Sequence, residues 1–180
     1  MGSTSMHITL MMVSTVNGKI TRGDDSTNQS WSSPEDAMLL NALKGKYKLL
    51  VMGRKTWQRK KKQIKLQPNI LRIILTKNPE KYVLDAINGQ LEFLNKTPKE
   101  LIPYLETRGY SKMLILGGSE TNALFFRDRL IDELHLTIEP RIFGLGKNII
   151  ADEELAVQLQ LVSVEKLNDS GTLHAIYSIQ

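Results

Sequence analysis

Short apolar runs of strand length alternate with helix-like segments along most of the 180 residues, and this alternation constrains the fold more than any other feature. The first run, HITLMMV at 7–13, is almost continuously apolar, which is typical of a strand buried on both faces of a parallel sheet. Further strands are expected at 49–52, 69–76, 91–94, 112–118 and 132–140. Such a chain is expected to form a mostly parallel sheet with helices on both faces.

The helices between these strands carry clear start and stop signals. In the segment 33–45, Ser33 can cap the first turn, Pro34 suits the first helical position, and Gly45 can end the helix. Asp36 stands three residues after the cap, where the acid of a capping box is found. Helices are also expected at 97–109 and 119–130, with a short basic helix through 59–62.

The C-terminal part of the chain has a different pattern. VQLQLVSVEKL and TLHAIYSI alternate apolar and polar residues around the turn NDSG at 168–171, which predicts an antiparallel hairpin. The whole pattern therefore predicts a single α/β domain over 6–180, in which an antiparallel hairpin completes a mostly parallel central sheet. Residues 1–5 (MGSTS) have the polar composition of a tag remnant and are left out of this fold.

The composition excludes several kinds of protein. The chain has no cysteine, which rules out disulfides and thiolate metal sites, and its three histidines lie in separate predicted strands without metal-ligand spacing. Its apolar runs are far shorter than the roughly 20 residues that span a bilayer, so we expect a cytoplasmic protein with no membrane partner. The net charge of +5 favours an anionic ligand. A nucleic-acid partner is not expected, because the basic run 59–62 lacks interleaved aromatic residues.

Two of the predicted strands end on glycines that lead directly into helices. These turns are Gly53–Thr56 (GRKT) and Gly117–Thr121 (GGSET). Glycine lets a ligand approach the backbone closely, and the N–H groups that follow attract phosphate. Neither turn is a G-x-G-x-x-G fingerprint, and the chain has no Walker A motif, so the common nucleotide-binding patterns do not apply. The pair of turns predicts a phosphate-binding edge of the sheet.

The segment 14–33 is a long loop without hydrophobic periodicity. It contains several glycine, aspartate and asparagine residues. Because a loop of this length inside a compact domain is usually functional, we expect it to close over a bound ligand.

Several motifs, in the same order along the chain, resemble those of one enzyme superfamily. LLVMGRKTW (49–57) and MLILGGSE (113–120) are similar to the cofactor-binding segments of dihydrofolate reductases. STVNGKI (14–20), WSSPED (31–36) and RLIDELHLTIEPRIFGLGK (129–147) look more like the reductase domains of riboflavin biosynthesis. The resemblance covers nearly all of 7–180 and implies a dihydrofolate-reductase-like fold, which agrees with the fold expected from periodicity.

The resemblance also implies a cofactor and a set of site residues. The cofactor is NADPH, and the peptide bond between Gly117 and Gly118 is expected to be cis. The residues implied to bind NADPH are Val13, Asn17, Gly18, Ile20, Gly53, Arg54, Lys55, Thr56, Thr76, Lys77, Gly117, Gly118, Ser119, Glu120 and Thr121. The residues implied to face the substrate are Met12, Trp31, Ser33, Asp36 and Leu40, with Asp36 as the candidate catalytic acid. Asp36 could instead only complete the helix cap, and Trp31 could instead plug the sheet face.

Departures from the family patterns leave the substrate open. Asn17 and Leu116 replace two acids that are usual in the riboflavin-pathway reductases, and WQRKKKQIKLQP (57–68) replaces their acidic stretch. The Pro-Trp pair of the folate enzymes is also absent. The first hypothesis is a 5-amino-6-(5-phosphoribosylamino)uracil reductase; the alternatives are a dihydrofolate or related pteridine reductase, and a relative that binds the dinucleotide without turnover. A homodimer is left open.

Overall fold

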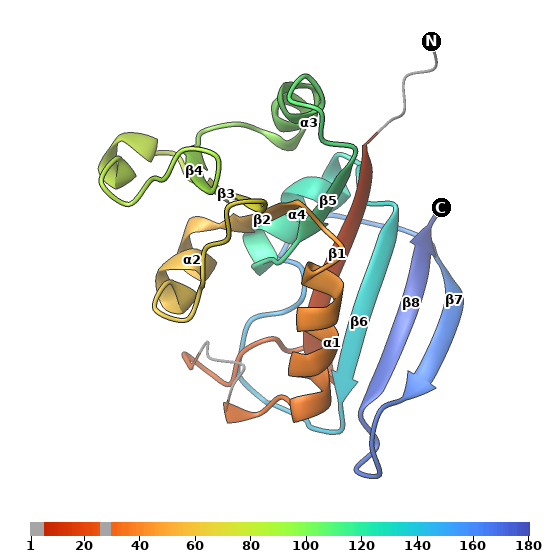
Figure 1. The fold of residues 1–180 in the computed structure, drawn as a ribbon. Coiled ribbons are helices and arrows are strands. Elements are labelled where there is room, and N and C mark those ends of the chain that lie inside the picture. Colours follow the sequence, from red (N-terminus) through yellow and green to blue (C-terminus); the bar gives the residue numbers. More distant parts are fainter. Residues whose placement is uncertain (1–5, 26–29) are drawn as a thin grey trace.

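The computed structural model describes residues 6–25 and 30–180 as one eight-stranded sheet with helices on both faces (Figure 1). The strand order is β4-β3-β2-β5-β1-β6-β8-β7. The strands are β1 (His7–Thr15), β2 (Leu49–Gly53), β3 (Leu71–Leu75), β4 (Leu91–Leu94), β5 (Lys112–Ile115), β6 (Glu133–Glu139), β7 (Leu159–Lys166) and β8 (Leu173–Ile179). All pairs from β4 to β6 are parallel, and β8 pairs antiparallel with both β6 and β7.

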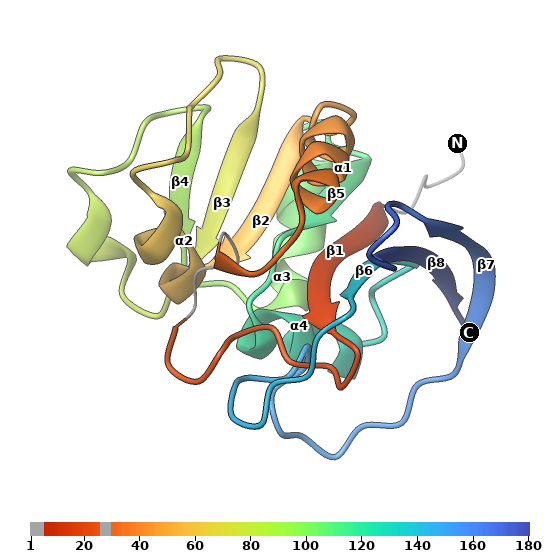
Figure 2. The ribbon, with the colours of Figure 1, turned by 90° about the horizontal axis from the view of Figure 1, so that it is seen from below.

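Four α-helices cover the parallel part of the sheet. They are α1 (Pro34–Lys44), α2 (Arg54–Lys60), α3 (Pro98–Glu106) and α4 (Ser119–Arg127), and a short 3-10 helix, η2, spans Pro79–Tyr82. Leu101 of α3 and Phe125 of α4 belong to the largest core cluster, on one face of the sheet. Leu43 of α1 and Trp57 of α2 belong to two smaller clusters, formed with the alternate residues of the strands on the other face. The helices therefore enclose the sheet from both sides (Figure 2).

The observed elements confirm the predicted fold class, with small differences at the element ends. Ser33 caps α1 by accepting from the Asp36 N–H, and Gly45 ends the helix, as expected. Helix α2 already begins at Arg54, so the basic run 59–62 is its end rather than a separate helix. Strand β5 stops at Ile115, where the chain turns into the Gly117–Gly118 pair. The expected tag remnant, residues 1–5, and part of the 14–33 loop, residues 26–29, lie outside the described residues.

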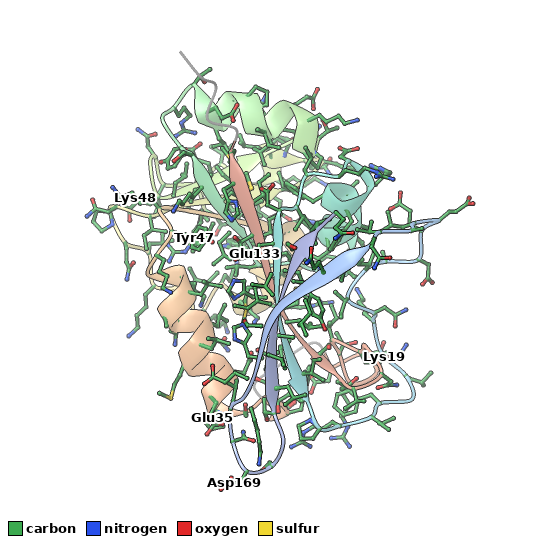
Figure 3. All side chains as sticks on the ribbon, turned by 90° about the vertical axis from the view of Figure 1, so that its right-hand side faces the viewer. Lys19, Glu35, Tyr47, Lys48, Glu133 and Asp169 are labelled. Atoms are coloured by element: carbon green, nitrogen blue, oxygen red, sulfur yellow. The ribbon has the colours of Figure 1, made fainter. Side chains whose placement is uncertain are left out.

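The chain between β6 and β7 contacts the long loop that follows β1. Lys19 and Asn148 form an isolated antiparallel bridge, and Lys19 Nζ also donates to Asn148 Oδ1 at 2.9 Å (Figure 3). A Cβ on Gly146 would overlap the carbonyl oxygen of Thr21, so the two segments touch backbone to backbone there. These contacts hold the described part of the 14–33 loop against 141–148, beside the carboxyl end of β1.

Candidate functional site

A cleft of about 1090 Å³ lies along the carboxyl ends of β1, β2, β3 and β5 and extends between α1 and α2 toward the starts of β2 and β3. Open α/β sheets bind ligands at this edge. The cleft wall is strongly basic: its acidic residues are Asp36 and Glu120, within the described chain. Its basic residues are Lys44, Arg54, Lys55, Arg59, Lys60, Lys65, Arg72, Lys77, Lys96 and Lys147.

One end of the cleft is formed by the two glycine turns, which pack directly against each other. The Gly53 N–H donates to the Gly117 carbonyl oxygen at 2.9 Å. A Cβ on Gly53 would lie 2.5 Å from Thr121 Oγ1, and a Cβ on Gly118 would lie 3.1 Å from Thr56 Oγ1. The Gly117–Gly118 peptide bond is cis, as the sequence resemblance implied. The missing Cβ atoms therefore allow two strand-to-helix turns to meet and present their backbones at one place.

Charged side chains surround this pair of turns. Lys55 and Glu120 form an ion pair at 2.6 Å that links the first turns of α2 and α4. The bond from Lys55 holds the pKa of Glu120 below its usual value. Arg54 Nη1 donates to Gln58 Oε1 at 2.7 Å on the same helix. Thr76 and Lys77, just after β3, also line the cleft. This end thus combines the backbone groups, hydroxyls and cations that a dinucleotide with phosphate groups requires.

The other end of the cleft contains a buried carboxylate. Asp36, in the first turn of α1, is 5% exposed, and its Oδ1 has no hydrogen-bond partner in the structure as described. Burial raises the pKa of Asp36; the nearby Thr137 and Ser32 side chains oppose this shift, and the neighbouring Glu139 adds to it. Thr137 Oγ1, on β6, is likewise buried without a partner. Asp36 can therefore hold a proton or bind an N–H group of a ligand.

The cap of α1 explains why the Asp36 carboxylate is not bound to the backbone of its own helix end. In a complete capping box, the acid would accept from the Ser33 N–H. Here the Ser33 N–H donates to Glu139 Oε1 at 2.6 Å, and Glu139 Oε2 accepts from Thr172 Oγ1 at 2.8 Å. Glu35 at the same helix end accepts from Asn168 Nδ2 at 3.0 Å, beside the turn that carries Asp169 (Figure 3). The Asp36 N–H does complete the cap by donating to Ser33 Oγ, but the Ser33 N–H that a capping-box acid would bind goes to Glu139.

The structure brings most of the expected site residues to the cleft wall, but not all of them. Those on the wall are Met12, Val13, Ile20, Asp36, Leu40, Gly53, Arg54, Lys55, Thr56, Thr76, Lys77, Gly118, Ser119, Glu120 and Thr121. Trp31 is 3% exposed and packs edge-on against Phe143, with ring centroids 5.4 Å apart. This burial agrees with the alternative that Trp31 packs against the sheet face rather than stacking on a ligand ring. Asn17 Nδ2 donates to the Phe143 carbonyl oxygen at 2.8 Å, so Asn17 ties the two loops together. Gly18, Ser33 and Gly117 also do not line the cleft.

Sequence reasoning missed Thr137, Lys44 and Arg72, whereas Lys60 belongs to the basic run 59–62, which the sequence left open as a phosphate contact. Lys44 and Lys60 are the last residues of α1 and α2, and Arg72 alternates with core residues on β3. An arginine inside the apolar run NILRIILT was the one available signal, because arginine is rarely buried without a partner.

The described residues contain no group of three or more histidines, cysteines or acids that could hold a metal ion. The expectation that the histidines hold ordinary strand positions missed one contact: His135 Nδ1 and His174 Nε2 lie 3.1 Å apart on neighbouring strands. No helix in the described part of the chain has the length and apolar character to span a bilayer.

Comparison with solved structures defines the class of fold. The chain is similar to a putative riboflavin biosynthesis protein from Shewanella sp. PV-4, with a TM-score of 0.78, 20% identity, and coverage of 97% of this chain and 99% of that one. It is also similar to dihydrofolate reductase from Enterococcus faecalis complexed with NADP(H), with a TM-score of 0.67, 19% identity, and coverage of 97% and 96%. The fold is therefore that of dihydrofolate-reductase-like α/β proteins, as predicted.

Sequence comparison then gives the family. The chain belongs to the RibD C-terminal domain family, whose model matches residues 6–173. Protein YyaP of Bacillus subtilis (strain 168) is 26% identical over 107 residues, which are 57% of this chain and 56% of that protein. The matched part is thus just over half the length of that relative.

Proposed function

We propose that the protein is an NADPH-dependent reductase that transfers a hydride to a C=N-type carbon, either in a ribosylaminopyrimidine in its open-chain form or in a pteridine. One observation carries the proposal: Asp36, a buried carboxylate whose Oδ1 has no hydrogen-bond partner in the described structure, lies in the same cleft as the two packed glycine turns. A reductase of this kind needs a bound dinucleotide beside the substrate ring and an acid that handles a proton. The family and the fold support the same class.

The residues at the glycine turns fit NADPH. Because Gly53 and Gly118 lack a Cβ, the Thr121 and Thr56 hydroxyls pack directly against them, and the two turns present backbone and hydroxyl groups at one place. Arg54 with the neighbouring turn would hold the NADPH phosphates, and Thr76 with Lys77 would lie near the adenosine ribose and its 2′-phosphate. NADPH supplies the hydride when bound. The chain's own part is to orient the nicotinamide and exclude water from it.

Asp36 would act on the substrate ring from the opposite side of the cleft. Burial leaves its raised pKa closer to neutrality than that of a free aspartate, so it can retain a proton that the nitrogen of the reduced C=N group needs. An N–H edge of the ring would satisfy Asp36 Oδ1 and Thr137 Oγ1. Leaving such a buried group unpaired costs about 1–3 kcal/mol, so pairing it contributes to binding.

The first substrate we propose is 5-amino-6-(5-phosphoribosylamino)uracil. Its supports are the family match and the basic cleft wall, since the substrate carries a phosphate. The second candidate is dihydrofolate or a related pteridine. The observation that favours it is the apolar side chain of Leu40 on the cleft wall, next to Asp36 on α1, which suits an aminobenzoyl group.

We further propose a cytoplasmic enzyme that forms a homodimer and has no nucleic-acid or membrane partner. The support for a dimer is β7, an edge strand of the sheet that exposes Leu161, Val162 and Val164 by 51–60%. Exposed apolar edge strands are normally paired or covered. Sedimentation equilibrium tests this, and a monomer at assay concentrations would contradict it.

Parallel turnover assays test the proposed activity. NADPH oxidation is measured by absorbance with the ribosylaminopyrimidine and with dihydrofolate, on the parent protein and on Asp36→Asn. We expect turnover of the pyrimidine and its collapse in Asp36→Asn. Robust turnover of dihydrofolate alone would reverse the order of the two substrates. NADPH binding without turnover of either would favour a non-catalytic relative.

A further inference from the structure

We propose that His135 and His174 form a histidine clamp, which fastens β8 to β6 beneath α1, positions Asp36 and opens when both imidazoles are protonated. The two histidines do not line the cleft, so they act on the proposed reaction only through other residues. The inference rests on the proposed function, because Asp36 is the candidate acid of that reaction.

The histidine clamp is a buried contact between two neighbouring strands. His135 on β6 and His174 on β8 are 8% and 7% exposed, and His135 Nδ1 lies 3.1 Å from His174 Nε2. His135 Nε2 lies 2.7 Å from Glu133 Oε1, two residues earlier on β6. Because an ionised carboxylate can only accept, His135 Nε2 carries a proton, and in the neutral pair His135 Nδ1 accepts from the Nε2–H of His174. The contacts therefore fix one tautomer for each ring.

The histidine clamp belongs to a polar row on the face of the sheet that α1 covers. His135 pairs with Met11 of β1, a member of the core cluster that α1 helps to form. Four alternate residues of β6 lie on this face: Glu133, His135, Thr137 and Glu139. Figure 3 shows Glu133 near Tyr47 at one end of α1 and Glu35 at the other end, so the row follows the length of the helix.

Two contacts of this row connect the histidine clamp with Asp36. On β8, His174 lies opposite Thr137, and Thr172 is two residues earlier on the same face. Thr137 is near the Asp36 carboxylate and opposes its pKa shift. Thr172 Oγ1 donates to Glu139, which accepts the N–H at the cap of α1. A β8 strand that loosens from β6 would disturb both contacts, so the histidine clamp positions Asp36 without touching it.

The histidine clamp can take up one proton and keep its bond. A first proton leaves one N–H and one lone pair between the two rings, beside the carboxylate of Glu133. A second proton puts an N–H on both facing nitrogens, so the bond is lost and two positive charges face each other. Two hydroxyls or two apolar side chains would join the strands equally well at every pH, whereas two imidazoles do so only while one is neutral.

The sign of the pH effect follows from His174. Burial lowers the pKa of His174, and the charge of His135 lowers it further. The neutral form is thus favoured in the folded chain, so the stability that it contributes is complete above the ordinary pKa of 6.5. That stability is lost as the pH falls below 6.5 and through the lowered pKa of His174.

The groups around the histidine clamp do not prevent this loss. The acids on the same face are Glu133, Glu139, Glu165 and Asp36. Glu165 on β7 is the cross-strand neighbour of His174 and opposes its pKa shift. Tyr47, after α1, donates from its hydroxyl to Thr9 Oγ1 at 2.7 Å, and the exposed His7 begins β1. At 3.1 Å the two ring nitrogens leave no room for any of these groups between them.

NMR and amide hydrogen exchange test the histidine clamp directly, because the chain has only three histidines. In the neutral protein, correlation spectra of the ring nitrogens should show His135 and His174 both as Nε2–H tautomers. Between pH 7.5 and pH 5.5, the protection factors of amides in α1 and β8 should fall about tenfold or more. In His174→Gln, whose amide can donate to His135 Nδ1 but cannot be charged, they should change less than about twofold.

His7→Gln is the matched control, since it removes an exposed imidazole that lies 3.7 Å from Asp132 at the start of β1. It should keep the pH response of the parent protein. An equal fall of protection in the parent and in His174→Gln, or an Nδ1–H tautomer of neutral His135, would overturn the proposal. If His174→Gln does not fold, His135→Gln gives the same decision.

The inference and the proposed function can fail separately. The NMR and exchange measurements need no turnover, so a pH response that disappears in His174→Gln supports the histidine clamp even if neither substrate is reduced. Where turnover is present, kcat should fall less between pH 7.5 and pH 5.5 in His174→Gln than in the parent, with the KM for NADPH unchanged. An identical pH profile of kcat in both would overturn the positioning of Asp36 and leave the reductase in place.

Discussion

The Ser33 N–H donates to Glu139 Oε1 at 2.6 Å, and this one bond separates the helix cap from the candidate catalytic acid. Because Glu139 occupies the position that the fourth residue of a capping box would fill, the Asp36 carboxylate faces the cleft instead of its own helix end. Glu139 is 3% exposed and is held in place by Thr172. A carboxylate from the neighbouring strand therefore releases Asp36 for chemistry.

The first prediction concerns Asp36→Asn. Because burial raises the pKa of Asp36 in the folded protein, its ionised form is less stable there than in the unfolded chain. The stability that protonation provides is complete below the ordinary value of 3.8 and is lost as the pH rises through the raised pKa. Asp36→Asn should therefore melt above the parent protein at pH 7, with the difference closing near pH 4. Its turnover should fall at least about 100-fold.

Scanning calorimetry from pH 4 to pH 8 measures the stability difference. Glu35→Gln is the control, since Glu35 lies next to Asp36 but has its pKa lowered, mainly by its bond from Asn168. A melting difference between Asp36→Asn and the parent that does not vary with pH would contradict the prediction.

The second prediction concerns cofactor choice. Arg54 is the first residue of α2 and lines the cleft. Lys55 and Lys77 line the same wall. Charge-assisted bonds to a 2′-phosphate are stronger than neutral ones, so Arg54→Ala should weaken NADPH about tenfold or more and NADH much less. Fluorescence titration with both cofactors measures this, with Arg127→Ala as a control, because Arg127 pairs with Glu153 outside the cleft. Equal losses for both cofactors would assign Arg54 to the pyrophosphate.

Much of this arrangement could be predicted from the sequence, because it depends on local signals. Continuous apolar runs identified the parallel strands, and period-two alternation identified the hairpin of β7 and β8. The glycines at 53, 117 and 118 indicated close backbone approach, and the structure places them where two turns meet. Ser33 and Gly45 marked the ends of α1 through capping chemistry that acts within one helical turn.

The parts that could not be predicted depend on partners far apart in the chain. Glu139 lies 106 residues from the N–H that it binds, and nothing near Ser33 indicates it. The buried Arg72 Nη1, which has no hydrogen-bond partner in the described structure, emerges only when α1 and α2 are both placed over β3. Trp31 looked suited to stacking on a ring, but its packing against Phe143 is set by the loop after β6. Local patterns do not encode such pairings.

The third prediction concerns the 14–33 loop. Asn17 bonds to the Phe143 carbonyl oxygen at 2.8 Å and accepts from Thr15 Oγ1 at 2.7 Å, so it fastens the loop beside the cleft. We expect NADPH to slow amide hydrogen exchange over 16–25 severalfold, because the loop closes over the nicotinamide. Asn17→Ala should exchange faster with and without NADPH, while Val16→Ala, whose side chain is 63% exposed, should match the parent. Exchange rates that do not respond to NADPH would exclude a closing loop.

The fourth prediction concerns the contact between the glycine turns. In Gly53→Ala the new Cβ would lie 2.5 Å from Thr121 Oγ1, so α2 and α4 must separate. Overpacking of this kind destabilises by about 1–3 kcal/mol, and the shifted turns should also weaken NADPH. Removing Thr121 Oγ1 relieves the clash, so Gly53→Ala with Thr121→Ala should recover much of both losses relative to Gly53→Ala alone.

Gly45→Ala is the control, since its Cβ would meet nothing closer than 3.5 Å. Urea unfolding and NADPH titration of the parent, Gly53→Ala, Thr121→Ala and the combined variant give a double-mutant cycle, and strictly additive effects would show that the two turns are not coupled.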